Sequence, residues 1–478
     1  MRDGPPVRGT ISRRFALVAA LSLFGCAGIK PDYQRPAAEL PAGWAAAQGQ
    51  GSASAGAEWW KIFGDAELDR LVGEALAHNA NLALAVARVD ESRAQVGLAR
   101  ADQLPVIGAT FDRSRTETSQ VAAFPFPPGF PRDTNDYRAA LNVSYEIDLW
   151  GRLRNLSAAA RAELLASEAA RETVRITLAA DVVQDYFALR ASDEQIATVQ
   201  RSLAARAEAL ALQKIRLDYG DISELDYRQL EAEVAAARAQ LPAFERQRSE
   251  QENALAVLLG RSPRAIYAGT VAGAAAADLA PAALFVPSGL PSELLLRRPD
   301  IVEAEQRLIA SNARIAAARA ELFPSIVLTG YLGSASAALS DLFTGPAGIW
   351  KLAAGLAQPV YAGGRLKEGI AAAEARERQA LAQYQQAVQN AFRDVRNALV
   401  AQAKSREQFD AESQRANALR QALQLARLRY NNGMTSLLEV LDAERNRLAA
   451  EQNRIDALRA QRAAIADLFK ALGGGWDA

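Results

Sequence analysis

The sequence predicts a mostly α-helical protein built from a duplicated unit, in which two strands precede a long helical hairpin. Three observations support this fold class. The stretch from Arg152 to Tyr219 contains neither Gly nor Pro and is rich in strong helix formers. A second such stretch lies between Gly364 and Gly433, interrupted only by Gly369. Each stretch follows a segment in which apolar and polar residues alternate, as they do in half-buried strands.

The composition narrows the range of possible functions. Lys plus Arg and Asp plus Glu are equal at 55 each, so nothing favours nucleic acid as a partner. The chain has one Cys, Cys26, and one His, His78, which excludes an internal disulfide and a Cys/His metal cluster. No nucleophile motif is visible and no glycine-rich loop follows a strand. The sequence therefore predicts no catalytic residue, no bound metal and no cofactor.

Residues 1–25 are typical of a signal peptide, with four arginines before the short apolar run Phe15–Phe24. The pair Arg13-Arg14 leaves open whether export uses the Sec or the twin-arginine route. The segment ends in Leu23-Phe24-Gly25-Cys26, which resembles a bacterial lipobox and predicts lipidation of Cys26. The alternative is a buried, unreactive thiol. Ala27, in place of an Asp, favours the outer membrane.

Residues 26–64 are predicted to form a lipid-anchored tether, because Lys30 to Gly56 is rich in Pro, Gly and Ala. The first structural repeat spans 65–264. It opens with a helix from Asp65 to about Ala101, with a possible break at Asn79–Asn81.

A β-hairpin, 105–150, follows this helix. Its first strand is expected at Pro105–Arg113 and its second at Tyr137–Trp150, with a Pro- and Phe-rich loop, Ala122–Asp136, between them. The second strand has one apolar face, formed by Tyr137, Ala139, Leu141, Val143, Tyr145, Ile147 and Leu149.

The first long helix is expected at Arg152–Tyr219 and would be roughly 100 Å long at 1.5 Å per residue. After a turn at Gly220, a return helix runs to about Leu259. Pro242 lies inside the return helix and is expected to kink it. An inter-repeat linker, 265–290, comes next.

The second repeat, 291–478, has the same order of elements. Asn81, Arg88 and Pro105 match Asp300, Arg307 and Pro324 at one constant offset. Gly151, Gly220 and Gly260 match Gly364, Gly433 and Gly473 at a second, slightly smaller offset. The second β-hairpin, 325–360, is therefore shorter than the first, with strands at Ser325–Ser336 and about Trp350–Val360.

Four strands in one chain are too few to close a membrane barrel, which needs about eight or more. No later stretch is apolar and long enough for a transmembrane helix. We therefore expect the chain to oligomerise, which would cover the edges of its sheet.

Several motifs in the right order carry a family resemblance. They are Cys26 to Pro36 (CAGIKPDYQRP), Trp59 to Asp65 (WWKIFGD), Gly289 to Ile301 (GLPSELLLRRPDI) and Phe323 to Ser325 (FPS). The chain resembles the TolC/OprM-type outer-membrane efflux proteins, in the lipoprotein branch that includes NodT. The resemblance covers nearly the whole mature chain.

The resemblance implies a homotrimer with a twelve-stranded β-barrel in outer-membrane lipid, standing on a long periplasmic α-barrel. It implies an outer-membrane channel that extends into the periplasm and serves a tripartite efflux system. The partners would be a periplasmic adaptor, or membrane fusion protein, and an inner-membrane pump of the RND type. The channel itself would do no chemistry.

The resemblance also places a periplasmic gate at the turn after the second long helix. Leu438, Asp442 and Arg445 lie on one helical face and match the family's gating positions. Three copies of Asp442 around one axis would favour cations, with Leu438 adding an apolar constriction. Tyr430 and Arg445 are candidate donors that hold the closed state, and Asp226 and Glu439, equivalent in the two repeats, are candidates to pair across neighbouring helices.

Three alternatives stay open at this point. Asp442 and Arg445 fit an ordinary surface pair worth about 0.2–0.5 kcal/mol, and Thr435 replaces the basic residue found at the corresponding place in TolC. A periplasmic adaptor-like coiled-coil lipoprotein also carries a lipobox and a helical hairpin, but only one hairpin. An exported enzyme is the third, although His78 fits a solvated helix end.

Overall fold

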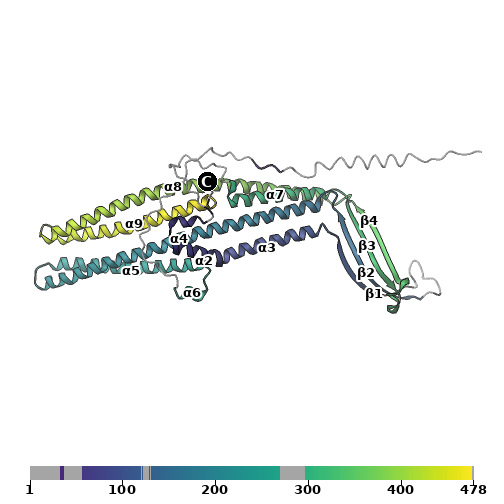
Figure 1. Ribbon diagram of the computed structural model, residues 1–478, viewed down its shortest axis with the longest axis horizontal. Coiled ribbons are helices and arrows are strands. Elements are labelled where there is room, and N and C mark those ends of the chain that lie inside the picture. The colour runs from purple at the N-terminus through teal and green to yellow at the C-terminus, as the bar shows by residue number, and fades with distance from the viewer. Residues whose placement is uncertain are drawn as a thin grey trace, which may run out of the picture. The chain divides into compact units, whose positions relative to one another are not determined.

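A computed structural model describes residues 33–36, 56, 58–119, 121, 129, 131–269 and 296–475. The predicted signal peptide 1–25, Cys26, most of the tether 26–64 and most of the linker 265–290 lie outside these residues. Figure 1 labels the helices and strands of the chain. The chain divides into two compact units. Unit 1 comprises Met1–Pro36, Val89–Ala166 and Ala304–Tyr384, and unit 2 comprises Ala37–Arg88, Ser167–Glu303 and Gln385–Ala478.

The helix expected from Asp65 to Ala101 is two helices, α2 (Ala66–His78) and α3 (Ala80–Ala101), after a short 3-10 helix, η2 (Trp59–Phe63). Asp65 caps α2 by accepting hydrogen bonds from two backbone amides of its first turn. Asn79 ends α2, and its side chain accepts from the amides of Asn81 and Leu82 at the start of α3. The predicted break therefore falls at Asn79, whose backbone amide closes α2 and whose side chain caps α3.

The strands form one antiparallel sheet in the order β1-β2-β3-β4, so β1 and β4 are its edges. Their bounds are β1 (Val106–Glu117), β2 (Asp133–Ile147), β3 (Ser325–Ser336) and β4 (Gly348–Ala357). Two short 3-10 helices, η4 (Leu339–Asp341) and η5 (Gly345–Ala347), lie in the second hairpin loop. The expected bounds of β3 are confirmed.

The other three strands correct the expected bounds. β1 ends at Glu117 instead of Arg113, and β2 starts at Asp133 instead of Tyr137. The ladder continues there because backbone pairing does not need an apolar face, and Arg115 also pairs with Asp133 at 2.9 Å. β4 runs from Gly348 to Ala357 instead of Trp350 to Val360.

β2 ends at Ile147 instead of Trp150 because the next residues build the junction to the long helix. Asp148 accepts from the backbone amides of Leu153 and Arg154, at 3.1 and 2.8 Å, which caps the helix. The Trp150 indole donates to the Pro324 carbonyl at 2.8 Å and stacks on Phe323. These contacts join the ends of the two repeats' strands.

The register gives the sheet two different faces. The positions opposite the apolar residues of β2 include Ile107 and Phe111 on β1, and Leu332 on β3 with its β4 partner Trp350. These side chains are exposed, Trp350 by 76%, so the single chain leaves the apolar face of its sheet uncovered. The opposite face carries polar groups, including Arg138, whose guanidinium lies over the Tyr331 ring.

The helices of the two repeats match in length. α4 (Arg152–Asp218) and α8 (Arg365–Asn431) have 67 residues each, and their return helices α5 (Glu224–Leu258) and α9 (Leu437–Ala471) have 35 each. α7 (Pro299–Ala320) has 22 residues, like α3.

Pro242 lies inside α5, which continues as one helix on both sides of it, so the expected kink stays a prediction. A short helix, α6 (Pro263–Tyr267), takes the first residues of the expected linker. Within the part of the chain that the structure describes, no helix is apolar enough over a sufficient length to span a bilayer.

The largest hydrophobic core lies in unit 2. It joins η2 and α2 to the middle of α4 and to the ends of α5 and α9. Trp59 stacks on Phe469 with ring centroids 4.8 Å apart, and Phe63 packs edge-on against Phe187. The Trp-Trp motif thus holds helices from both repeats together.

Candidate functional site

Helix α8 ends in a left-handed glycine at the start of the turn to α9. Gly433 has φ +70°, its amide donates to the Tyr430 carbonyl, and the Met434 amide donates to Arg429 at 2.8 Å. This pair of bonds is the Schellman arrangement, which needs a residue without a Cβ at the left-handed position. Gly220 closes the first hairpin with the same two bonds.

Leu438, Asp442 and Arg445 lie on the first three turns of α9, as the sequence predicted. The Leu438 residue is 52% exposed and the Asp442 side chain 62%. Arg445 Nη2 donates to Asp442 Oδ1 at 2.5 Å, and Arg445 Nε lies 3.5 Å from Glu233 Oε1 on α5. The structure brings these residues onto one exposed face, and the i, i+3 ion pair fits both the gate and the surface interpretation.

Among the described residues, no hydrogen bond joins Tyr430 to Asp442. Its hydroxyl accepts from Gln213 Nε2 on α4 at 3.1 Å, and its side chain packs against the apolar cluster of Leu230, Leu437 and Leu441. Tyr430 therefore links the first hairpin to the second, one turn before Gly433.

Asp226 and Glu439 occupy equivalent positions but have different partners. Asp226 accepts from the hydroxyl of Ser223, the N-cap of α5, at 2.8 Å. Glu439 accepts from the Thr435 hydroxyl and lies 3.5 Å from Arg429. Among the described residues, no hydrogen bond joins Asp226 to Glu439, so their pairing stays a prediction.

A charge network behind the tips was missed from the sequence. Arg206 on α4 is 4% exposed; its Nη1 donates to the Glu233 carboxylate at 3.0 Å, and its Nε lies 3.7 Å from Glu444 on α9. Arg427 on α8 donates to the same Glu444 at 2.6 Å. The network therefore joins all four helices of the two hairpins. One difference between the repeats could have indicated this network, because Arg206 corresponds to the apolar Leu419 in the second repeat.

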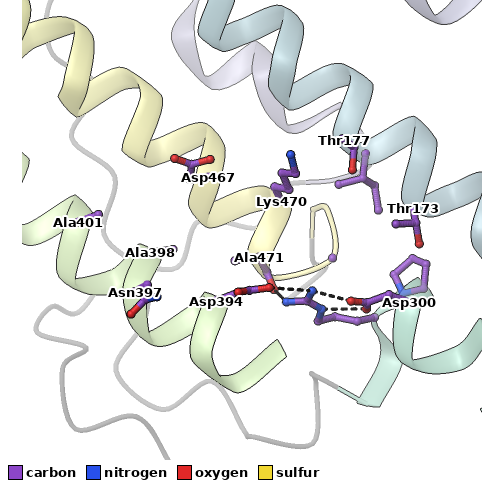
Figure 2. Close-up of a pocket in the computed structure, with 14 residues that line it drawn as sticks. Thr173, Thr177, Asp300, Asp394, Asn397, Ala398, Ala401, Asp467, Lys470 and Ala471 are labelled. Atoms are coloured by element: carbon purple, nitrogen blue, oxygen red, sulfur yellow. Dashed lines mark hydrogen bonds and ion pairs between the residues drawn. The ribbon is translucent and has the colours of Figure 1, made fainter. Parts of the chain in front are cut away.

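A second site in unit 2 explains the Arg-Arg-Pro-Asp motif. A cavity of about 410 Å³ is lined by α4, α8, α9 and the start of α7 (Figure 2). Arg298 is buried at its edge, donates to both carboxylate oxygens of Asp300, and donates to the Ala471 carbonyl at 2.5 Å. The motif thus ties the start of α7 to the end of α9.

The other charged groups of this cavity are also paired. Asp467 accepts from Gln184 at 2.7 Å, and Lys470 lies 3.2 Å from Asp181. Among the described residues, no group of three or more His, Cys, Asp or Glu side chains is arranged to hold a metal ion.

The model of the outer membrane efflux protein family matches residues 71–261 and 290–474. The chain belongs to this family. The family consists of transport channels rather than catalysts.

Curated relatives match over nearly the full length. The chain is 38% identical to outer membrane protein OprJ of Pseudomonas aeruginosa, over 97% of this chain and 95% of the relative. It is 35% identical to the probable outer membrane lipoprotein SilC of Salmonella typhimurium, over 95% and 96%. With the cation efflux system protein CusC of Escherichia coli K12 it shares 34% identity, over 95% and 98%.

Solved structures share the fold. The CmeC outer membrane channel of Campylobacter jejuni superposes with a TM-score of 0.88 at 27% identity, over 94% of this chain and 95% of that one. The outer-membrane channel OprN superposes with a TM-score of 0.84 at 30% identity, over 94% and 99%.

These findings confirm the fold class predicted from the sequence. The chain is an outer-membrane efflux protein that extends into the periplasm. The adaptor alternative is not favoured.

Proposed function

We propose that three copies of this chain form the outer-membrane channel of a tripartite efflux system. The observation that carries the proposal is the four-stranded sheet, which has two unpaired edges and an uncovered apolar face. An apolar face of this size needs lipid or protein against it, and open edges need partner strands. Three sheets joined edge to edge in a membrane would pair these strand edges with one another and place the apolar faces against lipid.

The proposed partners are a periplasmic adaptor and an inner-membrane RND-type pump, which supplies the energy. The chain itself passes substrates and catalyses no reaction. The relatives point to this role, since their names include a cation efflux system protein and a solvent efflux pump outer membrane protein.

The proposed gate is the turn between α8 and α9. Leu438 and Asp442 are exposed in the single chain, and threefold symmetry would turn them towards one axis. Three like charges repel each other, so the closed state needs donors. Arg445 already neutralises Asp442 at 2.5 Å, and the interhairpin pair of Arg445 with Glu233 restrains its position. Glu439, Asp226 and Tyr430 are proposed to support the same turn.

Cys26, which precedes the described residues, is the proposed lipid attachment point. The relative SilC is named a probable outer membrane lipoprotein, which supports the proposal. A lipid on Cys26 would hold the N-terminal end of the chain at the membrane.

Planar bilayer recordings of the purified full-length protein test the channel and its gate together. We expect discrete ion-conducting steps with a preference for cations, because carboxylates line the narrowest point. Asp442→Asn keeps the side chain's shape and is expected to lower the cation preference. A protein that stays monomeric in detergent and never conducts contradicts the channel, and an unchanged preference in the variant contradicts the gate.

A further inference from the structure

Residues 33–36 of the tether are described, and they contact α7 through one carboxylate. Arg35 donates to both oxygens of Glu305, from Nε at 2.7 Å and from Nη2 at 2.6 Å. The Tyr33 hydroxyl donates to Glu305 Oε1 at 3.1 Å. Two parallel bonds from one guanidinium are the strongest and most directional form of an ion pair between side chains.

The burial is unequal between the two partners. Glu305 is 6% exposed, whereas the Arg35 side chain is 53% exposed. A buried carboxylate needs a cation or several donors, since its desolvation is costly. Glu305 also lies near Tyr384 of α8, a buried phenol whose pKa is raised by burial and then by the Glu305 charge. Glu305 and the neighbouring Tyr384 thus form a buried acidic site on the helices, here called the socket, and the tether supplies the cation that pairs with it.

The socket exists in only one of the two repeats. At the constant offsets that relate the repeats, Glu305 corresponds to Val86 on α3, and Tyr384 corresponds to Arg171 on α4. A valine accepts no hydrogen bond, and an arginine repels another arginine. The first repeat therefore has no equivalent place for Arg35, which directs the tether to the second.

The spacing along the chain limits where the N-terminal end lies. Cys26 precedes Tyr33 by a span of at most about 25 Å for extended chain. From Glu305 to Ala320, the last residue of α7, the helix rises by about 22 Å. The two lengths are nearly equal, so a chain held at Glu305 can bring Cys26 level with the start of the sheet only when it is almost fully extended.

We propose that Glu305 is a docking site for the tether, at which Tyr33 and Arg35 bind as a latch that fixes the distance between the N-terminal anchor and α7. The contacts of residues 33–36 with Glu305 support the latch itself. Its role as a measure of distance rests on the proposed lipidation of Cys26.

Chymotrypsin tests the latch in the full-length protein, because it cuts after Tyr33 and that bond is protected while the latch is closed. Trypsin is unsuitable, since Lys30 and Arg35 both precede proline. We expect Arg35→Gln and Glu305→Gln to raise the rate of this cleavage about tenfold or more, as local opening becomes easier. Arg35→Lys should fall between them and the parent, because an ammonium cannot form the two parallel bonds.

Gln34→Ala is the matched control, since Gln34 is exposed between the two latch residues, and it should cut at the parental rate. The doubly substituted Arg35→Glu/Glu305→Arg protein should regain part of the protection. Cleavage of Arg35→Gln at the parental rate overturns the latch, and Arg35 lies on the tether, so this variant does not depend on refolding of the helices.

A deletion of residues 29–32 tests the role in measuring distance. It shortens the reach from Cys26 to Tyr33 to about 11 Å, so lipid insertion and the latch should compete. Cleavage after Tyr33 should therefore rise in the lipidated deletion variant and not in the same deletion with Cys26→Ser. Equal rates in both backgrounds overturn this role. Mass spectrometry of Cys26 reports lipidation separately, so an unmodified Cys26 refutes the anchor while the dependence on Arg35 still decides the latch.

Discussion

The hairpin of α4 and α5 and the hairpin of α8 and α9 have the same lengths, 67 and 35 residues, and the same glycine turn. Their tips carry different chemistry. Asp442 and Arg445 of the second hairpin correspond to Gln229 and Ala232 of the first, so at these two positions only the second hairpin carries a carboxylate and its counterion. The two repeats therefore share the lengths of their helices but differ in charge at these positions of their tips.

The first hairpin contributes the buried cation instead. Arg206 on α4 holds Glu233 and Glu444 from two other helices, and its equivalent on α8 is Leu419. The first repeat thus supplies the buried cation between the hairpins, and the second repeat carries the proposed gate residues. Substitutions at equivalent positions can break or sharpen this division.

The largest effect is expected from Arg206→Leu, which gives the first hairpin the residue of the second. It takes the buried cation away from Glu233 and Glu444, which keep only the exposed Arg445 and Arg427 among the described residues. The cost should therefore be smaller than the roughly 3–5 kcal/mol of a buried charge left without any partner. The apparent unfolding temperature of the detergent-solubilised protein should fall accordingly. Arg201→Leu is the control on the same helix, because its exposed pair is worth at most about 1 kcal/mol. Equal shifts for both variants would contradict the network.

Asp442→Ala is expected to raise single-channel conductance in planar bilayers, since it removes the carboxylate of the proposed gate together with its ion pair to Arg445. Gln229→Ala, at the equivalent position of the first hairpin, should leave conductance unchanged. If both variants raise it to the same extent, the tips are not specialised.

Ser223→Ala should destabilise the first return helix by about 1 kcal/mol, because the Ser223 side chain caps α5 by accepting from the Asp226 amide. Ser436→Ala should cost less, since Ser436 makes no side-chain capping bond to α9. Hydrogen exchange of the first-turn amides measures the two helices separately. The reverse order would show that the capping difference does not hold in the assembled protein.

The smallest effect concerns pH and distinguishes α4 from α8. Burial, and then the charge of Asp181, raise the pKa of Asp185 to about 6, and its equivalent on α8 is Ala398. The folded state binds this proton more tightly than the unfolded state, whose pKa is about 4. Stability from this group is therefore present at low pH and is lost as pH rises to about 6. Asp185→Asn should stabilise the protein slightly at pH 8 and not at pH 4, measured as unfolding temperature, and a gain of the same size at both values would contradict the assignment.

Much of the fold was predictable because its signals are local. The absence of Gly and Pro from Arg152 to Tyr219 predicted one long helix, and α4 ends at Asp218, one residue before the expected end. The alternation in β2 gave its faces, but not its ends, because backbone pairing continues into polar residues and Asp148 leaves the strand to cap α4.

The candidate site was only partly predictable. Spacing placed Leu438, Asp442 and Arg445 on one face, since one helix determines that geometry. The partners of Arg206 lie on α5 and α9, far away in sequence, and no local pattern brings them together. Tyr430 was predicted to be a donor at the gate, but its hydroxyl accepts from Gln213 of the other hairpin. No local pattern predicts this contact either, because the two residues lie far apart in the sequence.

The order of the sheet has a consequence for assembly. With four antiparallel strands, β1 and β4 run in opposite directions, so β4 of one copy can continue the ladder of β1 in the next. Such head-to-tail contacts are satisfied only when the ring closes. Two copies joined in this way still expose two unpaired strand edges, so incomplete assemblies are the species most prone to aggregate before they reach lipid.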